Sequence, residues 1–344
     1  MISQSIPLVC VCIPNYNNEK TINKTLDSLI NQTYKNIRIK IFDNASTDNS
    51  IEILKKYEKE YENIQIFQNK INIGGEANFT KCIQNLEGEF GAIFHADDLY
   101  TPTMVEEQVQ FLIKYSECSA VSTYGFIIDE NSNIISKRPI PNEFLEEKHY
   151  VIGNQLNLLK KIFENGNFIT CPSVLARTDI YKNKIIEWKG EQFKTSADLD
   201  VWLRLAEFGK FGYISNPLIY YRESTASYSF NDRRARLDEN NMFLVLEYYL
   251  NRYKDRLDNK DLNNLKFLYF KDNINRTINQ IIKNNRNQKL DINCFDFKII
   301  SLAFKNKDNF KIYLIGLIVK FLRNFGIKES IRNKLYEIRF GKKI

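Results

Sequence analysis

Histidine is scarce in this sequence and its cysteines are not paired, which narrows the metal chemistry available to it. The 344-residue chain has two histidines, His95 and His149, and six cysteines, none of them in a Cys-x-x-Cys pair. A structural zinc site needs four such ligands at close spacing, so we expect none. Cys10 and Cys12 alternate within an apolar run, and we predict that both are small core residues on one face of a strand.

Nucleotide-binding loops of the common types and membrane segments are also missing. The sequence has no G-x-G-x-x-G element and no P-loop, so Rossmann cofactor chemistry and P-loop kinase chemistry have no support. The apolar run at 312–319 is too short to span a bilayer. Residues 1–7 lack the basic and apolar stretches of a signal peptide. We therefore expect a reduced, cytoplasmic protein.

Charge is divided unevenly along the chain. Residues 231–344 hold 25 Lys and Arg against 13 Asp and Glu, a net charge of +12, whereas residues 1–230 have a net charge of −5. We predict two parts, a catalytic region at 1–230 and a basic module at 231–344. A strongly basic part suggests an anionic partner, either nucleic acid or a membrane surface.

Apolar periodicity in the first hundred residues alternates between the strand and the helix pattern. It predicts strands at 8–13, 37–42, 64–67 and 90–94, with helices at 20–31, 49–61 and 76–86. Strands separated by helices of this length imply right-handed crossovers and a parallel sheet. The fold class predicted is therefore α/β.

Four polar clusters follow the predicted strands or precede a predicted helix. They lie at 14–17, 43–48, 72–75 and 97–98. Ligands of parallel sheets bind beyond the carboxyl ends of the strands, so we expect the clusters to converge there.

Asp97 and Asp98 end a buried strand, where two adjacent carboxylates are costly unless a cation pairs them. Mg²⁺ or Mn²⁺ would do so while holding substrate phosphates, because both prefer hard oxygen ligands. The alternative is a solvated turn before a helix starting near Pro102.

The other clusters also have two interpretations each. Helix capping explains Asp48, whereas Asp43 at a strand end could accept a hydrogen bond from a nucleobase. Gly74 and Gly75 could form a flexible turn, or let the backbone approach a ribose or phosphate closely.

Taken in order, the segments 13–19, 43–48, 72–75 and 95–98 resemble a family 2 glycosyltransferase of the GT-A fold. The resemblance covers roughly residues 7–230. It implies a Rossmann-like, mostly parallel central sheet flanked by helices, here followed by a C-terminal helical module. It also implies a UDP-sugar donor and a Mn²⁺ or Mg²⁺ cofactor held by Asp97 and Asp98.

The same resemblance implies a set of residues that contact the nucleotide-sugar. They are Pro14, Tyr16, Asn17, Glu19, Asp43, Asn72, Gly74, Gly75, Asn78, His95, Ala96, Asp97 and Arg222. His95 stands where the family's D-x-D element often begins with Asp. It could contact the ribose, neighbour the metal through a water, or be a plain strand-end residue. Ser224 stands where the family often has His.

Asp198 is the catalytic base that the resemblance implies. Residues 196–205 resemble the family's helix led by a carboxylate, which places Asp198 in the first turn. The alternative is a cap that meets the helix dipole, an environment that should keep Asp198 ionised with a low pKa. Asp200 is the other candidate base, although it points about 200° away around the helix.

Neighbouring residues have predicted supporting roles. Arg204 is expected to orient this region or to pair with Asp200, and Val201, Leu205 and Phe208 are predicted to share an apolar stripe. Arg222 suits a phosphate, or a structural ion pair. The segment 166–173 resembles the stretch that shapes the sugar and acceptor pocket.

The basic module is predicted to be helical, with helices at 240–253 and 262–282. Residues 310–323 mix apolar bulk with cations, which suits an anionic membrane surface. The alternative is a core-packing helix with a solvated basic face. Nucleic-acid binding lacks a recognisable module, so we expect no nucleic-acid partner.

Together with these residues, the resemblance implies an inverting, metal-dependent transferase that moves a hexose or N-acetylhexosamine from a UDP-sugar to a hydroxyl of a glycan or lipid-linked acceptor. The expected setting is assembly of bacterial lipooligosaccharide, capsule or O-antigen on the inner face of the cytoplasmic membrane. A non-catalytic nucleotide-sugar-binding or scaffold protein remains the alternative. A sugar-nucleotide pyrophosphorylase would need a glycine-rich basic loop after the first strand, which residues 14–17 do not provide.

Overall fold

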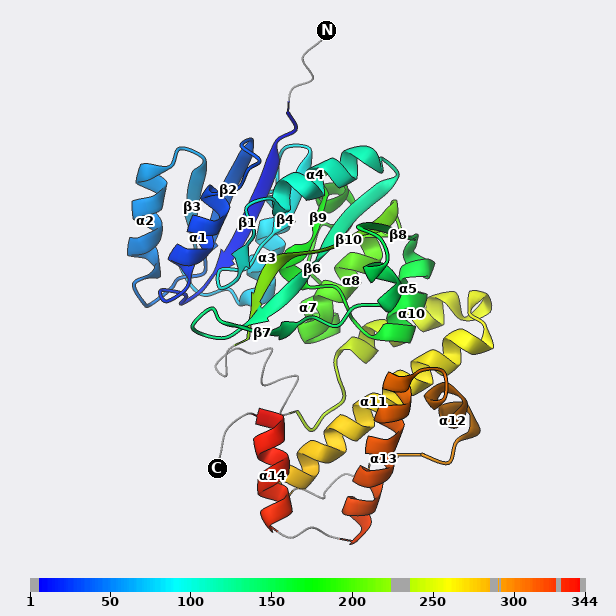
Figure 1. Cartoon of the computed structure of the whole chain (residues 1–344). Coiled ribbons are helices and arrows are strands. Elements are labelled where there is room, and N and C mark those ends of the chain that lie inside the picture. Colours follow the sequence, from blue (N-terminus) through cyan, green and yellow to red (C-terminus); the bar gives the residue numbers. More distant parts are fainter. Residues whose placement is uncertain (1–5, 224–235, 285–289, 291, 326–328, 341–344) are drawn as a thin grey trace. The chain divides into compact units, whose positions relative to one another are not determined.

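The computed structural model describes residues 6–223, 236–284, 290, 292–325 and 329–340. The chain divides into two compact units (Figure 1). The first comprises Met1–Leu159 and Asn167–Glu223, and the second comprises Lys160–Gly166 and Ser224–Ile344. The predicted boundary after residue 230 and the unusual Ser224 both lie outside the described residues.

One sheet organises the first unit. Its strands are β1 (Val9–Asn15), β2 (Ile37–Asp43), β3 (Ile64–Gln68), β4 (Phe90–Ile93), β5 (Leu99–Tyr100), β6 (Cys118–Ile128), β7 (Ile134–Lys137), β8 (His149–Gly153), β9 (Leu175–Arg177) and β10 (Lys210–Arg222). The order is β3-β2-β1-β4-β9-β6-β10-β5, with β7 beside β6 and β8 beside β10.

The half of the sheet built by the first hundred residues is parallel, as predicted. Strands β3, β2, β1 and β4 pair in parallel, and the register places Asn15 of β1 opposite Asp43 of β2 and Asp43 opposite Gln68 of β3. The polar residues that follow these strands therefore meet at one edge. The other half is mixed, because β9 runs antiparallel to both β4 and β6 whereas β10 runs parallel to β6.

Helices cover both faces of this sheet. They are α1 (Ile22–Ile30), α2 (Ser50–Glu60), α3 (Gly75–Gln84), α4 (Met104–Lys114), α5 (Gln155–Asn165), α6 (Thr178–Ile180), α7 (Gly190–Phe193) and α8 (Ala197–Leu205). The helices predicted from residues 20–86 are confirmed as α1, α2 and α3.

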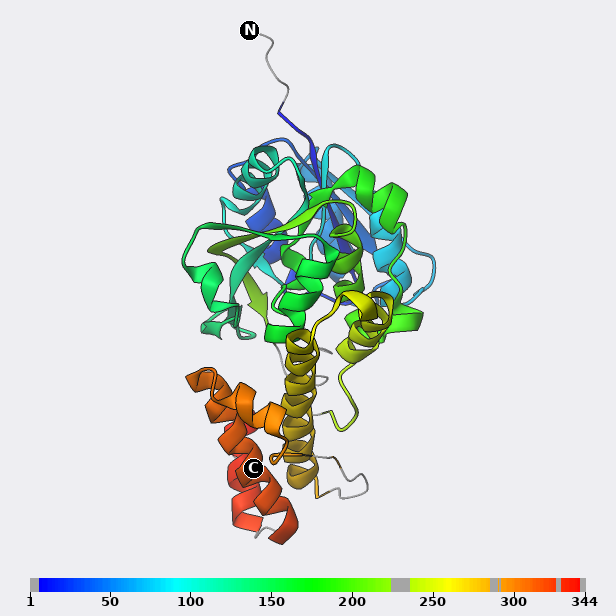
Figure 2. The same cartoon turned by 90° about the vertical axis from the view of Figure 1, so that its right-hand side faces the viewer.

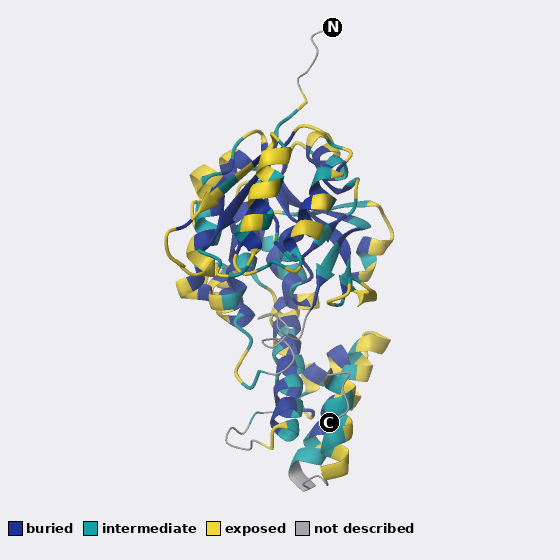
Figure 3. Cartoon of the chain, turned by 90° about the vertical axis from the view of Figure 1, so that its left-hand side faces the viewer, coloured by how far each residue is buried: buried dark blue, intermediate teal, exposed yellow. Residues whose placement is uncertain are grey.

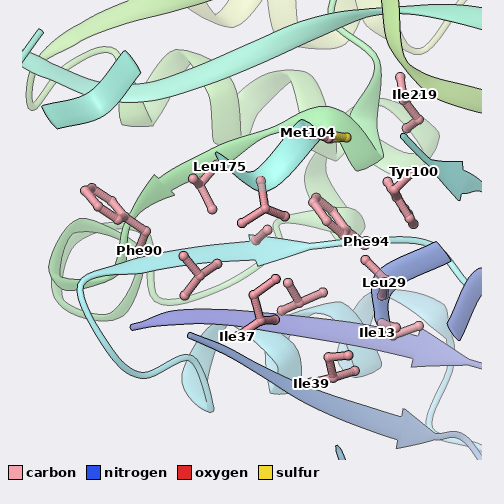
Figure 4. Close-up of a cluster of buried hydrophobic side chains, with 14 of the residues drawn as sticks. Ile13, Leu29, Ile37, Ile39, Phe90, Phe94, Tyr100, Met104, Leu175 and Ile219 are labelled. Carbon is pink, nitrogen blue, oxygen red and sulfur yellow. The ribbon is translucent and has the colours of Figure 1, made fainter. Parts of the chain in front are cut away.

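Alternation along β1 decides which side chains face which helices. Val9, Val11 and Ile13 belong to a core cluster shared with α1, α2 and α4 (Figure 4). Cys10 and Cys12 point to the opposite face, are fully buried, and have their sulfur atoms 4.0 Å apart. The prediction that both cysteines are core residues on one face is confirmed.

The second unit is helical. Its helices are α10 (Met242–Tyr253), α11 (Asn259–Ile282), α12 (Phe297–Ala303), α13 (Lys307–Phe325) and α14 (Glu329–Phe340). α12, α13 and α14 all contact the long α11 (Figure 2). Asp258 begins α11 with a capping box, because it accepts a hydrogen bond from Asp261 N at 2.9 Å while its own N donates to Asp261 Oδ2 at 3.1 Å.

Unit 2 has a small apolar core of its own. Phe267, Phe270 and Ile274 of α11 pack with Ile299 of α12 and Val319 of α13. The helices predicted at 240–253 and 262–282 are confirmed as α10 and α11. Across the part of the chain that the structure describes, no helix combines the length and the apolar character needed to cross a membrane.

Candidate active site

The loops after β1 and β2 are joined by hydrogen bonds at the carboxyl edge of the sheet. Asn15 Nδ2 donates to Asp43 Oδ1 at 2.8 Å, and Asn17 N donates to Ser46 Oγ at 2.9 Å. Asn17 adopts a φ of +54°, a conformation that Asn tolerates better than most residues. The first two predicted clusters therefore form one structure, with Tyr16 45% exposed beside it.

Asp43 is fully buried within this structure. Besides the bond from Asn15, its carboxylate accepts hydrogen bonds from Ser46 Oγ at 2.6 Å and Ser46 N at 3.1 Å. These contacts hold the two loops in place. A contact between Asp43 and a nucleobase stays a prediction.

Glu19 and Asp48 tie the first loop to the start of α2. Asp48 Oδ1 accepts from Ser50 N and its Oδ2 accepts from Glu19 N, both at 3.0 Å. The bond from Ser50 fits the interpretation of Asp48 as a capping residue, although Asn49 is the residue that directly precedes α2. Glu19 Oε2 in turn accepts from Asn49 N at 3.0 Å.

A network of asparagines shapes the loop before α3. Asn44 Nδ2 donates to Asn72 Oδ1 at 2.9 Å, and Gly74 N donates to the same oxygen at 2.8 Å. Gly74 has a φ of +84°, which favours glycine. Asn78 is buried and its Nδ2 donates to Phe42 O at 2.8 Å, which anchors α3 to the end of β2.

His95, Asp97 and Asp98 bring their ligand atoms together just after β4. One such atom from each residue lies within 4.8 Å of the other two. His95 Nδ1 is 3.6 Å from Asp98 Oδ2. Among the described residues, Asp98 Oδ2 and His95 Nε2 are buried without a hydrogen-bond partner. Burial raises the pKa of Asp98 and lowers the pKa of His95.

Arg222, at the end of β10, is buried and bound by protein groups. Its backbone N donates to Asp98 Oδ1 at 2.6 Å and its Nε donates to Asp97 O at 2.7 Å. The guanidinium also donates to Asp129 O at 2.7 Å and Ser132 Oγ at 3.1 Å. These bonds support the structural alternative for Arg222. Its contact with phosphate stays a prediction.

Asp198 lies in the first turn of α8, as predicted, and is partly exposed. Its Oδ1 accepts a hydrogen bond from Leu199 N at 2.8 Å. Burial nevertheless raises the pKa of Asp198 to about 6, against the lowering by that bond and by the charge of Arg138. The expectation of a low pKa is wrong, because desolvation outweighs the helix terminus.

Asp200 is taken up by an ion pair. Arg204 Nε donates to Asp200 Oδ2 at 2.7 Å, which confirms the predicted pair, and Arg204 also donates to Ile185 O at 2.6 Å. The predicted apolar stripe is only partly correct. Val201 and Leu205 are buried, but α8 ends at Leu205, and Phe208 beyond it is 44% exposed.

These geometries agree with the comparisons to known proteins. A family model described as glycosyl transferase family 2 matches residues 10–183. The chain belongs to this family. The protein is therefore a glycosyltransferase, and Asp198 and Arg222 lie beyond the matched segment.

Relatives of this glycosyltransferase cover most of its length. EpsE of Bacillus subtilis, named as a glycosyltransferase, is 28% identical over 219 residues, which are 62% of this chain and 72% of EpsE. An uncharacterized glycosyltransferase of Haemophilus influenzae is 25% identical over 291 residues, covering 81% of this chain and 85% of that protein.

A solved structure shows the same fold. S. aureus TarS 1–349 in complex with UDP matches with a TM-score of 0.54 at 15% identity, covering 97% of this chain and 92% of that chain. A second TarS structure, in complex with UDP-GlcNAc, matches to the same extent. The predicted α/β fold of the GT-A type is confirmed.

The cluster of His95, Asp97 and Asp98 fits a divalent cation, which family 2 glycosyltransferases generally use. Two carboxylates and an imidazole are suitable ligands for Mn²⁺, and the carboxylates for Mg²⁺. The two buried polar atoms without a partner point to the same conclusion, because such atoms are rare unless something binds them.

Sequence reasoning did not single out two residues that interact electrostatically with the candidate site residues. Burial and then the charges of Asp198 and Asp98 raise the pKa of Cys171. Arg138 lowers the pKa of the same three groups through its charge. Arg138 had no motif to mark it, whereas Cys171 lies in the segment 166–173 that was predicted to shape the pocket.

Proposed function

We propose that this family 2 glycosyltransferase transfers a hexose or N-acetylhexosamine from a UDP-sugar to a hydroxyl group with inversion, in a reaction that depends on Mn²⁺ or Mg²⁺. The observation that carries the proposal is the cluster of His95, Asp97 and Asp98, whose ligand atoms lie within 4.8 Å of one another and include buried atoms without a hydrogen-bond partner. A second acidic group, Asp198, acts through its charge on the same thiol, Cys171, as Asp98 does.

The environment of Asp198 suits a general base. A carboxyl with a pKa of about 6 is ionised at neutral pH, yet takes a proton more readily than an ordinary aspartate. Asp198 would accept the proton of the acceptor hydroxyl as that oxygen attacks the anomeric carbon. One displacement with one base gives inversion.

The residues after β4 would hold the donor diphosphate. A divalent cation bound by Asp97 and Asp98 would neutralise the charge that develops on the leaving UDP. Arg138 lies within electrostatic reach of both acidic groups and adds positive charge to the same region. The loops at Asn15–Asn17 and Asn72–Gly75 would contact the uridine part.

The relatives favour a role in surface polysaccharide assembly. TuaG of Bacillus subtilis, whose name refers to teichuronic acid biosynthesis, is 26% identical over 243 residues, and a chondroitin synthase of Pasteurella multocida is 26% identical over 264 residues. We infer that the acceptor is a glycan or a lipid-linked glycan. A lipid-linked acceptor would place the enzyme at the inner face of the cytoplasmic membrane.

Thermal unfolding with a panel of nucleotides tests the proposal. UDP or a UDP-sugar with Mn²⁺ should raise the unfolding midpoint, because a ligand at 100 times its Kd stabilises the folded state by about 2.7 kcal/mol. EDTA should abolish the shift, and GDP should give a smaller one. No shift with any nucleotide would contradict the proposal. A metal-dependent UDP shift without turnover of any UDP-sugar would favour the scaffold alternative.

A further inference from the structure

Helix α13 has two apolar faces, and the described residues of unit 2 cover only one of them. On one face, Val319 is buried in the core of the unit, and the backbone at Gly316 approaches α11 so closely that a Cβ there would lie 2.8 Å from Phe270. The alternative predicted from the sequence was a helix that packs into a core and has a solvated basic face on its other side. The packing into the core is observed, but the opposite face carries apolar side chains as well as lysines.

We define the outer face of α13 by residues that lie about 180° from Gly316 at 100° per residue. They are Lys307, Lys311, Leu314, Ile318 and Phe321, with Phe310 and Leu322 at the two margins, about 60° from this direction. Ile318 is 57% exposed and Leu314 is 43% exposed, and both lysines are exposed (Figure 3 marks exposed residues in yellow). An apolar stripe with lysines at the N-terminal end of the same helix face is typical of a helix that lies in a membrane interface.

The connection from α12 extends this surface. The rings of Phe304 and Phe310 are 5.2 Å apart, so the end of α12 and the start of α13 are held together. Phe304 is 68% exposed and Phe297 on α12 is 82% exposed, with the exposed Lys298 and Lys305 next to them in sequence. Exposed phenylalanines with adjacent lysines suit the boundary between acyl chains and anionic headgroups.

We propose that the outer face of α13 docks on an anionic lipid bilayer, with the helix lying in the plane of the interface. α13 contains one acidic residue, Asp308, and its charge acts on Lys271 of α11. The outer face itself is therefore purely cationic and apolar. A second copy of the chain is a poorer occupant, because this face carries lysines and no carboxylate that could pair with them across a two-fold interface.

The helix geometry also excludes a spanning arrangement. Nineteen residues extend about 28 Å, but one face of α13 is committed to the core of unit 2. Only the outer stripe is available to lipid. Docking would then depend both on apolar insertion by Leu314 and Ile318 and on attraction between the lysines and anionic headgroups.

Co-sedimentation of the full-length protein with lipid vesicles tests this inference. The wild type should bind vesicles of phosphatidylcholine with phosphatidylglycerol, and should bind pure phosphatidylcholine at least tenfold more weakly. Raising the salt concentration should weaken binding, because it screens the charges. Vesicle binding is measured without any sugar donor, so its outcome is independent of the proposed enzymatic function.

Two pairs of matched variants separate the contributions. L314Q/I318Q should reduce binding at least tenfold. I113Q/I135Q, which changes two side chains of unit 1 that are at least as exposed, should leave binding unchanged. K307Q/K311Q should reduce binding about tenfold to thirtyfold, since each interfacial lysine adds about a factor of five. K55Q/K56Q on α2 is the charge control.

Three results would overturn the inference. The first is the absence of binding to anionic vesicles, and the second is equal loss of binding in the test and control variants. The third is a different occupant of the face. A concentration-dependent dimer that L314Q/I318Q abolishes would identify a second copy, and binding to a DNA duplex without vesicle binding would identify nucleic acid. Unchanged thermal unfolding of L314Q/I318Q would show that the variant is folded.

Discussion

The two units differ in the side chains that stand out in each, which are fully buried carboxylates in unit 1 and strongly exposed phenylalanines in unit 2. Unit 1 buries charged and amide groups, and Asp43, Asp98 and Asp200 are each 1% exposed or less. Unit 2 leaves large apolar side chains at its surface, including Phe297 and Ile318. Both choices carry a free-energy cost, because a buried carboxylate loses its hydration and an exposed apolar group remains in water.

The contrast indicates where each unit acts. Within unit 1 the buried Asp200 is paired with Arg204. The raised pKa of Asp198 shows that the protein stabilises the charged form of this carboxyl less well than water does. Strongly shifted acids of this kind cluster at catalytic sites. In unit 2 the uncompensated groups are apolar and exposed, which points to a surface that binds something.

The largest expected effect comes from removing the charge of Asp198. Asp198→Asn should lower kcat by about 10²–10⁴-fold, because the acceptor hydroxyl loses its base, while UDP and Mn²⁺ still bind. Initial rates of product formation at pH 8 check this. A rate like that of the wild type would remove Asp198 from the mechanism.

The same base predicts the pH profile of the wild type. Activity needs the ionised carboxylate, so kcat/KM should fall tenfold per pH unit below an apparent pKa of about 6. Asp200→Asn is the matched control, because Asp200 is bound to Arg204. The folded Asp200→Asn protein should show the same fall of kcat/KM below about pH 6 as the wild type, although its free energy of unfolding should be lower.

Replacing the buried Arg222 tests how much its hydrogen bonds and charge stabilise unit 1. Arg222→Met should destabilise the fold by about 3–5 kcal/mol, because it leaves Asp97 O and several other acceptors without their donor and removes one of the two positive charges that act on Asp98. Lys311→Met on the exposed face of unit 2 should change stability by less than about 0.5 kcal/mol. Urea unfolding compares them. Wild-type stability of Arg222→Met with weakened UDP binding would instead support the phosphate contact.

Removing a carboxylate of the cluster should weaken metal binding. Asp97→Ala should lower the affinity for Mn²⁺ and for metal-dependent UDP by at least tenfold, while Asp308→Ala in unit 2 should lower neither. Calorimetric titration of Mn²⁺ in the presence of UDP measures both. Equal affinity in Asp97→Ala and the wild type would show that the metal binds elsewhere.

The sequence was most informative where structure is decided locally. The strands β1–β4 and their helices follow from apolar periodicity, and the loops at Asn15–Asn17 and Asn72–Gly75 follow from their turn residues. Parallel pairing then brings these loops to one edge. The strands β5 and β9 have only two and three residues, and pairing across the fold rather than local pattern forms them.

The electrostatics of the site were harder to predict for the same reason. The position of Asp198 in a first helical turn is local and was predicted, but its desolvation comes from distant segments that pack around it. Arg138 likewise reaches the site because β7 pairs with β6, and its backbone N donates to Gly125 O at 3.0 Å. A motif search cannot find a residue whose role depends on such pairing.

The smallest expected effect is a gain in the stability of Asp198→Asn. It distinguishes the carboxyl of Asp198, which is destabilised in its charged form, from that of Asp200, which is paired with Arg204. Burial raises the pKa of Asp198 from 3.8 to about 6. The folded protein therefore holds this proton more tightly than the unfolded chain, and the contribution of Asp198 to stability is lost as the pH rises from about 4 through about 6. Asp198→Asn carries no such charge and should be more stable than the wild type at pH 8 by about 1–3 kcal/mol.

Thermal unfolding of Asp198→Asn and the wild type between pH 4 and pH 8 measures this difference. The gap between their midpoints should be largest at pH 8 and should shrink toward pH 4, where the wild-type carboxyl is also neutral. Asp200→Asn should instead lose stability at pH 8, because Arg204 would stay buried without its partner. A gap for Asp198→Asn that does not vary with pH would show that desolvation does not control this carboxyl.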